Sequence, residues 1–556
     1  MNITRPDGST VTFAYNEHGL PLTATGPDGA TTSYTYDDHG RRTATTDPTN
    51  ATTTYGYDER DQLASVTDAL GATLHVICNP AGLPQQITDA MGATTVYRRD
   101  AFGRPISITD PLGATTHQEW TPDGKIVSRT GPDGATQTWE HDGEGNCVRQ
   151  TDPVGGVTTY EYGHFDLLTA QTGPDGVRHT FAYDSELRLT RVTNPQRLTW
   201  TYEYDPTGGL ISETDFDDRT IHYARDAVGR LTFRANPTSQ TVSFTYDELG
   251  RMVRKNADGD ATNYTYDPCG RLLTATGPDA ELVYQRDRVG RIRTEMVNGH
   301  LLTHDYNNLG REIRRVTPSG AVTTYTYDAA GNRTAVTANG HTLASDHDAA
   351  GRETTRHLDE VLTLANTWDP AGRLTSQTLT GPGTPTAPAD PRLALMSGSG
   401  MPAPTTGGPL QRRIYTYRAD GYLKALSDQL DGDRSFALDH AGRVTQVNAH
   451  DWTETYAYDE AGNQTHATWP TTHTHPDAVG ERTYAGTTIR SAGRIRYEDD
   501  DAGRVVLRQK QRLSKKPDTW TYTWDAEDHL TQAVTPDGTT WRYGYDLSAA
   551  ALPNSA

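Results

Sequence analysis

The stretch Tyr246-Asp247-Glu248-Leu249-Gly250-Arg251 decides the fold of this chain, because its frame returns throughout the sequence. The frame is an aromatic residue, Asp, two variable residues, Gly and Arg. The position before the Asp recurs in eleven consecutive steps of 21 residues, from Tyr15 to Tyr246, and in steps of 20 or 21 residues as far as Trp368. A fixed period of this length indicates a repeat array, in which each unit packs against its neighbours.

The recurring positions of the frame are expected to be structural. Asp at the first position of a turn can accept hydrogen bonds from the backbone two residues on, and Gly at the fourth position accepts a positive φ. We therefore interpret the repeated Asp residues as turn caps rather than as calcium ligands or paired catalytic carboxylates. The structural repeat positions predicted in four copies are Tyr36, Asp37, Gly40, Tyr246, Asp247, Gly250, Arg251, Tyr266, Asp267, Gly270, Arg271, Tyr327, Asp328 and Gly331.

A second turn signal lies about ten residues from the first, as in Gly26-Pro27-Asp28-Gly29. Pro at the second position presets φ for a type I or II turn. Between the two turns lie short runs rich in Thr and Tyr that alternate with period two, such as residues 31–36 and 42–46. This pattern predicts an all-β, antiparallel meander with about two strands per repeat. Because neither face is strongly aliphatic, we expect a curved wall with water on both sides.

The bulk composition excludes several partners. The chain has 556 residues, 34% hydrophobic residues and a formal net charge of −21. The acidic balance disfavours nucleic acid, whose phosphates need clustered Lys and Arg, and anionic membrane surfaces. No apolar run approaches the roughly 18 residues of a membrane span. The amino terminus has no signal-peptide pattern, and the three cysteines are too few and too scattered for a disulfide framework.

The sequence offers no constellation of catalytic residues, so we predict no enzyme activity and no cofactor. It has no Gly-x-Ser-x-Gly, His-Glu-x-x-His or phosphate-binding loop. His466, His473 and His475 form the one histidine cluster, which we interpret as solvated loop residues rather than a metal site. We interpret the basic run from Arg508 to Lys516 mainly as a solvated turn. The arginines of the Gly-Arg pairs are expected to form ion pairs with Asp of adjacent repeats, worth roughly 0–1 kcal/mol each.

The frame Tyr-Asp-x-x-Gly-Arg-Leu, followed by a Thr-rich strand, a Pro-Asp-Gly turn and Tyr-x-Tyr-Asp, resembles the RHS or YD repeat from about Arg5 to Asp546. The resemblance implies a spiral that builds a hollow β-shell. It further implies a bacterial RHS-type polymorphic toxin carrier whose shell encapsulates a C-terminal toxin cargo, used in bacterial competition. Such a protein is secreted or associated with the cell envelope.

Alternatives remain open at this stage. YD repeats are also linked to carbohydrate binding, so a cell-surface module that binds glycans through exposed Tyr and Trp is the main rival. An enzyme is the second rival. The Asp-Pro-x-Gly-Leu motif, where self-cleavage resides in such shells, does not follow the repeats here. We therefore expect a structural shell fragment without its own toxin domain.

Four segments are predicted. Regular repeats occupy residues 1–379, a flexible insertion rich in Pro, Gly and Ser occupies 380–412, and irregular repeats occupy 413–546. Residues 547–556 form a tail outside the repeat pattern, and the first residues begin inside a repeat. We expect a partial, open wall. Truncation, a disrupted gene and a shift of the reading frame near Asp546 all remain open as origins of the tail.

Overall fold

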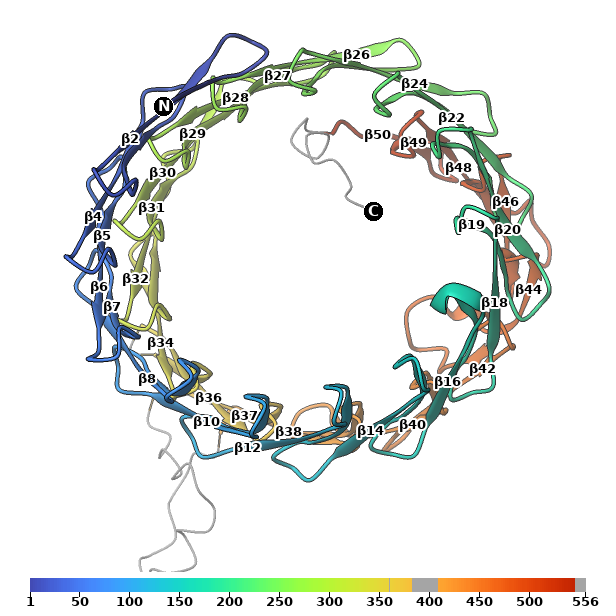
Figure 1. Ribbon diagram of the computed structural model, residues 1–556. Helices are drawn as coiled ribbons and strands as arrows, with labels where there is room; N and C mark the ends of the chain where they lie inside the picture. Colours follow the sequence, from blue (N-terminus) through green and yellow to red (C-terminus); the bar gives the residue numbers. More distant parts are fainter. Residues whose placement is uncertain (360, 383–408, 546–556) are drawn as a thin grey trace, which may run out of the picture.

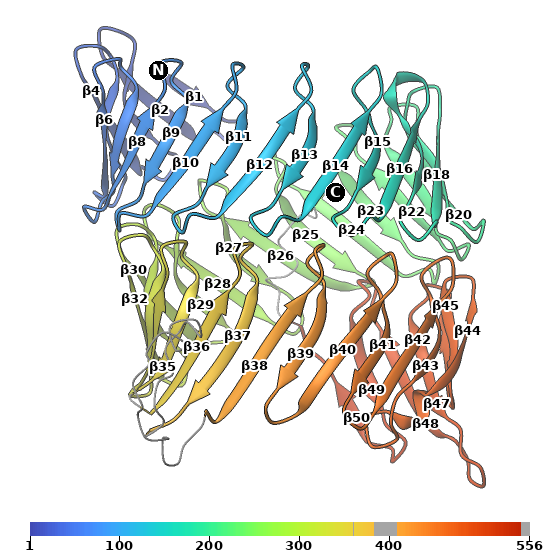
Figure 2. The ribbon, with the colours of Figure 1, turned by 90° about the horizontal axis from the view of Figure 1, so that it is seen from below.

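The computed structural model describes residues 1–359, 361–382 and 409–545. In this part of the chain it contains 50 β-strands in one sheet, and each strand pairs antiparallel with the next one in the sequence. Figure 1 shows that the sheet curves round into a hollow ring when it is seen along its axis. Figure 2 shows that the ring is a spiral, with one coil stacked on the other. The predicted antiparallel meander and hollow β-shell are therefore confirmed.

We call residues 1–266 the first coil, and the described residues among 267–545 the second coil. The strands of the first coil are β1 (Asn2–Thr4), β2 (Thr10–Tyr15), β3 (Pro21–Thr25), β4 (Thr31–Tyr36), β5 (Arg42–Thr46), β6 (Thr52–Tyr57), β7 (Leu63–Thr67), β8 (Thr73–Cys78), β9 (Pro84–Thr88), β10 (Thr94–Arg99), β11 (Pro105–Thr109), β12 (Thr115–Trp120), β13 (Ile126–Thr130), β14 (Thr136–His141), β15 (Cys147–Thr151), β16 (Val157–Tyr162), β17 (Leu168–Thr172), β18 (Arg178–Tyr183), β19 (Leu189–Thr193), β20 (Thr199–Tyr204), β21 (Leu210–Thr214), β22 (Thr220–Arg225), β23 (Leu231–Ala235), β24 (Thr241–Tyr246), β25 (Met252–Ala257) and β26 (Asp260–Tyr266).

The second coil continues the same meander with slightly more irregular hairpins. Its strands are β27 (Leu272–Thr276), β28 (Glu281–Arg286), β29 (Ile292–Val297), β30 (His300–Tyr306), β31 (Glu312–Val316), β32 (Val322–Tyr327), β33 (Arg333–Ala338), β34 (His341–His347), β35 (Glu353–Leu358), β36 (Leu362–Trp368), β37 (Leu374–Thr380), β38 (Gln411–Tyr417), β39 (Leu423–Asp428), β40 (Gly432–Leu438), β41 (Val444–Ala449), β42 (Thr453–Tyr458), β43 (Gln464–Thr468), β44 (Gly480–Ala485), β45 (Thr488–Ala492), β46 (Ile495–Asp499), β47 (Val505–Lys510), β48 (Asp518–Trp524), β49 (Leu530–Val534) and β50 (Thr540–Arg542). In the described ranges, two single-turn 3₁₀ helices, η1 (His164–Asp166) and η3 (Pro476–Ala478), lie in loops.

Each tyrosine-containing hairpin is built the same way. The turn of residues 37–40 is closed by the amide of Gly40, which donates to the carbonyl of Asp37. The amide of Asp37 donates in turn to the carbonyl of Arg41, and the register shifts by one residue between Thr35 and Tyr36. A four-residue turn followed by a bulge gives the strands extra right-handed twist. Repeated around the chain, this twist curves the sheet.

The wall is a single layer with little hydrophobic core. Among the described residues, one buried apolar cluster is formed by Tyr264, Ala275, Leu282 and Tyr284. The strand ladder and side-chain ladders must therefore supply most of the stability. One such ladder consists of threonine hydroxyl pairs across consecutive hairpins, at 2.8–2.9 Å: Thr25–Thr31, Thr46–Thr52, Thr67–Thr73, Thr88–Thr94, Thr109–Thr115 and Thr130–Thr136.

The change of period from 21 to 20 residues has a structural cause. In the hairpin that joins β25 and β26, Asp258 and Gly259 form a two-residue turn with φ of +52° and +108°. Asn298-Gly299 and Asn339-Gly340 form equivalent turns in the second coil. A two-residue turn of this kind needs positive φ at both positions, which Asn-Gly and Asp-Gly supply. These two-residue turns stand where most repeats of the first coil have a four-residue turn.

The predicted strands and turns around Tyr34, Tyr264 and Tyr325 are confirmed, because these residues lie in β4, β26 and β32. The predicted insertion lies largely outside the described residues. So does the predicted tail after Tyr545. The four-segment division stays a prediction.

Candidate functional site at the seam between the coils

The repeated turn is held by its Asp. The Oδ1 atom of Asp247 accepts hydrogen bonds from the amides of Leu249 and Arg251, both at 2.9 Å. Its Oδ2 atom accepts the Nε of Arg251 at 2.6 Å. Burial raises the pKa of Asp247, but the hydrogen bonds and the charge of Arg251 outweigh burial and hold this pKa below its usual value.

The other repeat positions named from the sequence have the same geometry. Asp37 and Asp267 cap their turns and bind the Nε of the following arginine, and Asp328 caps its turn with Asn332 in place of arginine. The fourth turn residue needs a left-handed backbone that strains any residue except glycine. The φ angles are +77° at Gly40, +80° at Gly250, +87° at Gly270 and +99° at Gly331.

The aromatic residue before the Asp links one repeat to the previous one. The hydroxyl of Tyr246 donates to the carbonyl of Leu231, fifteen residues earlier, at 2.7 Å. Trp120 makes the equivalent bond through its indole Nε1, and Arg99 through its guanidinium Nε. Tyr, Trp and Arg at this position all supply a donor to this carbonyl, whereas Cys78, His141, His347 and Leu438 occupy it in other repeats. The same bond is made by Tyr36, Tyr57, Tyr183, Tyr204, Tyr266, Tyr306, Tyr327, Trp368, Tyr417 and Tyr458.

The prediction that Gly-Arg arginines pair with Asp of adjacent repeats holds at Arg41–Asp61 and Arg504–Asp528, but most of these arginines pair within their own turn. Arg230 pairs with Asp226 of its own turn at 2.6 Å. Toward the next repeat, Arg230 donates to the carbonyl of Asp247 at 3.4 Å, and its guanidinium lies 4.9 Å from the ring centre of Tyr246. The turn brings Asp and Arg four residues apart into contact, so the carboxylate is already occupied. The arginine reaches the next repeat through a carbonyl and an aromatic ring.

The two coils meet along a seam, visible across the middle of Figure 2. On this seam a series of first-coil turns that begins with Gly26–Gly29, many of which contain Pro, faces the Asp-capped turns of the second coil. The third residue of each of these first-coil turns lies toward the second coil. We call these residues the third turn positions: 28, 49, 70, 91, 112, 133, 154, 175, 196, 217 and 238. They recur every 21 residues.

Among the described residues, three of the ion pairs between the coils join a third-turn Asp of the first coil to a Gly-Arg arginine of the second coil, and we call these three the seam ion pairs. All six side chains are largely shielded from water, with at most 27% exposure. Each Asp belongs to a Gly-Pro-Asp-Gly turn. The seam ion pairs are Asp28–Arg271 at 2.8 Å, Asp133–Arg373 at 2.7 Å and Asp175–Arg443 at 3.0 Å.

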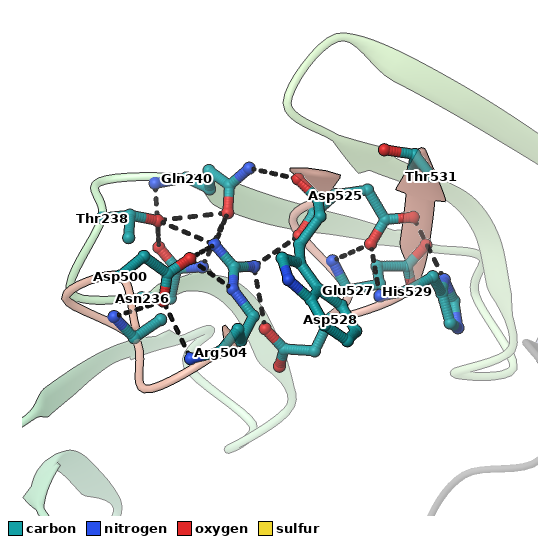
Figure 3. Close-up of polar contacts among 12 residues, drawn as sticks. Asn236, Thr238, Gln240, Asp500, Arg504, Asp525, Glu527, Asp528, His529 and Thr531 are labelled. Carbon is teal, nitrogen blue, oxygen red and sulfur yellow. Dashed lines mark hydrogen bonds and ion pairs between the residues drawn. The ribbon is translucent and has the colours of Figure 1, made fainter. Parts of the chain in front are cut away.

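Figure 3 shows the seam around Arg504. Arg504 binds Asp500 of its own turn and also donates to the Gln240 side chain of the first coil at 2.9 Å. The side chain of Gln240 donates to the carbonyl of Trp524 at 3.3 Å. Two strands further on, the Nζ of Lys255 binds Glu527 at 2.6 Å, and the lysine side chain is only 8% exposed.

Asp217 is another third-turn residue on the seam. Its carboxylate accepts the amide of Thr487 at 2.7 Å and the hydroxyls of Thr487 and Thr488 at 2.6 and 2.9 Å. Burial raises the pKa of Asp217, but the bonds from Thr487 and Thr488 and the charge of Arg219 bring it below its usual value. The sequence reading treated this Asp series as turn residues and missed the seam. The available signal was that the third turn position is Asp in some repeats and Leu, Met or Val in others, so the turn itself does not require Asp.

The structure places two histidines of the predicted cluster, His473 and His475, at one cavity and the third, His466, in a strand. His473 bonds Glu454 at 3.1 Å and packs edge-on against Trp452, beside a cavity of about 570 Å³ that His475 also lines. His466 lies in β43. In the part of the chain that the structure describes, no group of three or more His, Cys, Asp or Glu side chains is placed to hold a metal ion.

The basic run is partly paired. Arg508 stacks on Trp520 at 4.5 Å, and Lys510 binds Asp477 at 2.6 Å. The hairpin tip is open to water, since Leu513 is 92% exposed. No helix among the described residues is long and apolar enough to cross a membrane.

Known protein families now identify the repeat. The RHS repeat model matches residues 1–31, 15–52, 36–73, 79–116 and 306–342, and the teneurin YD-shell model matches residues 122–283 and 166–317. The chain is an RHS/YD-repeat protein. This RHS/YD-repeat chain is 28% identical over 146 residues to probable deoxyribonuclease RhsB of Dickeya dadantii (strain 3937), which covers 25% of the chain and 9% of RhsB. Over 144 residues it is also 28% identical to probable deoxyribonuclease RhsA of that strain, covering 24% of the chain and 9% of RhsA.

The fold of this RHS/YD-repeat chain is shared by solved shells. The crystal structure of TcdB2-TccC3 superimposes with a TM-score of 0.55 at 11% identity, covering 94% of the chain and 38% of that structure's chain. The Photorhabdus luminescens Tc holotoxin pore with the TccC3-D651A mutation gives a TM-score of 0.52 at 12% identity, covering 95% and 30%. The chain thus spans well under half the length of the relatives that it matches. It is a shell-forming RHS repeat region.

Proposed function

We propose that the chain forms part of the wall of a toxin-delivery shell, which encloses a polypeptide cargo and keeps it apart from the surroundings until delivery. The observation that carries this proposal is the hollow spiral itself. Its wall is a single sheet layer, and its two coils are stacked along the axis and joined by seam ion pairs (Figures 1 and 2). A single-layer wall buries little apolar surface of its own. It leaves a wide lumen, as a container requires.

The names of the relatives support a cargo of toxin type. RhsA and RhsB are probable deoxyribonucleases, and TcdB2-TccC3 is a component of a Tc holotoxin. The matched segment is a small part of RhsA and of RhsB. The deoxyribonuclease activity in their names therefore belongs to the whole protein, of which the matched repeat region is one part. By analogy, the parent of this wall is a secreted or envelope-associated carrier.

The repeated tyrosines do not support the glycan-binding alternative. A sugar would need an open aromatic face to stack on, yet one face of these rings is covered by the arginine of the preceding repeat. The guanidinium carbon lies 4.8–5.4 Å from the ring centre at Tyr57, Tyr204, Tyr246, Tyr266, Tyr306, Tyr327, Tyr417 and Tyr458.

Protease protection tests enclosure. A protease-sensitive reporter is fused after Ala556 in one protein and before Met1 in another, and cleavage of both is followed by time-resolved gel electrophoresis. We expect slower cleavage of the carboxy-terminal reporter, because β50 lies within the outline of the ring in Figure 1. Equal cleavage rates for the two reporters, each equal to that of the free reporter, would contradict enclosure.

A further inference from the structure

Arg311 differs from the other arginines of the Asp-capped turns because its own turn lacks the carboxylate. The turn begins with Asn307, whose Oδ1 accepts the amides of Leu309 and Arg311, both at 3.0 Å. The side-chain amide of Asn307 offers a donor where Asp offers Oδ2. The Nε of Arg311 is consequently buried with no hydrogen-bond partner. At Arg251, Arg271, Arg291 and Arg352 this Nε binds the Asp of the turn at 2.5–2.8 Å.

Arg311 also lacks a carboxylate across the seam. Arg311 follows Arg271 by 40 residues, which is two repeats of the second coil, and Leu70 follows Asp28 by 42 residues, which is two repeats of the first coil. Because Asp28 binds Arg271, this register places Leu70 opposite Arg311. Both residues line the same cavity of about 930 Å³ at the seam. Arg311 therefore misses both carboxylates that Arg271 holds.

The rest of the cavity is mainly apolar or already paired. Leu70 and Ala72 of the first coil face it, with Ile313 and Tyr325 of the second coil. Asp89 also lines the cavity, but its Oδ1 accepts the amides of Met91 and Ala93 in its own turn. Asp328 is likewise occupied by Asn332. Neither carboxylate forms an ion pair with Arg311 among the described contacts.

We infer that this cavity is a binding site for a carboxylate carried on an apolar or aromatic stem. The ligand carboxylate takes the place of the missing third-turn Asp and accepts hydrogen bonds from the terminal Nη atoms of Arg311, of which Nη1 also donates to the carbonyl of Asp328 at 3.3 Å. Guanidinium and carboxylate match in planar geometry and form short, charge-assisted bonds. The stem lies against Leu70, Ile313 and Tyr325, where apolar contact removes it from water. The carboxylates of Asp89 and Asp328 oppose a bare anion, so the stem is necessary for affinity.

The site is tested with two probes on the full chain. One probe is 3-phenylpropionate, a free acid, and the other is acetyl-Ala-Glu-Ala-amide, which carries the carboxylate on a polypeptide side chain. Binding is measured by saturation-transfer NMR and by isothermal titration at low salt. Binding of the free acid alone identifies a small-molecule site, and binding of the peptide identifies a polypeptide side-chain site; both support the inference. Absence of binding by either probe overturns it.

Variants that give Arg311 a carboxylate from the protein itself provide the decisive control. Leu70→Asp places a carboxylate opposite Arg311, and Asn307→Asp supplies the partner of its Nε. Each is expected to weaken probe binding about tenfold, since one charge-assisted bond is replaced internally. The matched control is Thr49→Asp, which adds the same charge one repeat away, opposite Arg291, whose Nε is already paired with Asp287. Equal affinity of wild type and both site variants, or an equal loss in Thr49→Asp, overturns the inference.

Discussion

Two stretches of the seam differ in one recurring position. From Asp133 to Lys255 the first coil meets the second through carboxylates, amides and a buried lysine. From Thr49 to Leu112 the third turn positions are Thr, Leu, Met and Leu, and Leu70, Met91 and Leu112 are 45–61% exposed. The backbone of the turns is the same in both stretches. The difference shows that the turn builds the wall, whereas side chains along the seam, at the third turn positions and at Gln240 and Lys255, decide where the two coils are held together.

This separation has a physical basis. Within a coil, each repeat is joined to the next by the strand ladder and by the bonds of the Tyr, Asp and Arg positions, which need nothing from the other coil. Across the seam the described strands form no pairs and bury little apolar core, so single polar contacts carry the stacking. Exposed ion pairs contribute little, and these pairs are partly shielded. The well-joined stretch should therefore respond strongly to single substitutions, and the other stretch weakly.

The largest effect is expected from breaking the buried pair at the joined end. Glu527→Ala leaves the ammonium of Lys255 buried without its carboxylate. Removing one partner of a buried pair costs about 3 kcal/mol. The free energy of unfolding from urea titration should fall by about this amount. The double variant Lys255→Met/Glu527→Leu should regain most of the loss, and failure to regain any would show that the pair itself is not what matters.

A smaller effect is expected from removing the three seam ion pairs together. Asp28→Asn, Asp133→Asn and Asp175→Asn keep the turns but remove the charges that bind the second-coil arginines. At roughly 0.5–1 kcal/mol for each partly shielded pair, the combined loss is about 2 kcal/mol. Calorimetry should show the change, and it should shrink at high salt because screening already weakens the pairs. A salt-independent change would assign the effect to the turns instead.

Acid should weaken the seam by protonating the carboxylates that join the two coils. Hydrogen bonds from Ala30, Cys269 and Arg271 and the charge of Arg271 outweigh burial and lower the pKa of Asp28 below its usual value, and Asp217 behaves alike. A carboxylate with a lowered folded-state pKa contributes stability above its unfolded pKa of about 4, and this stability is lost as the pH falls through the folded-state value. Urea midpoints should be flat from pH 8 to 5 and fall below pH 4. The triple Asn variant should show a shallower fall.

Much of the wall could be predicted from the sequence because its signals are local. The alternation around Tyr34 and Tyr36 and the turn residues Asp37 and Gly40 specify strand and turn within one repeat. The seam could not be predicted in the same way. Asp28 and Arg271 are 243 residues apart, and their contact depends on how many repeats complete one coil. That number follows from the twist accumulated over all the hairpins, which no single repeat reveals. The unpaired state of Arg311 could be suspected from Asn307, but the absence of a partner opposite it needs the register of the two coils.

The smallest effect is expected from adding a carboxylate to the weakly joined stretch. Leu112→Asp places an Asp at a third turn position beside Arg352, with which Leu112 shares a cavity. Arg352 already binds Asp348, so the new pair adds at most about 1 kcal/mol. Thermal unfolding should rise by a few degrees at most, and Val154→Asp serves as a second trial at another apolar third turn position. A decrease in both variants would contradict the seam register.

Hydrogen–deuterium exchange on two matched variants tests the central claim most directly. Asp133 and Asp123 are each the third residue of a four-residue turn that contains Pro-Asp-Gly, ten residues apart on opposite rims of the first coil, and in the described part of the chain Asp133 pairs across the seam with Arg373 whereas Asp123 forms no ion pair. We predict that Asp133→Asn speeds exchange in the second-coil turn of residues 369–373, whereas Asp123→Asn leaves that turn unchanged. Equal exchange in residues 369–373 for the two variants would contradict the claim that third-turn carboxylates hold the coils together.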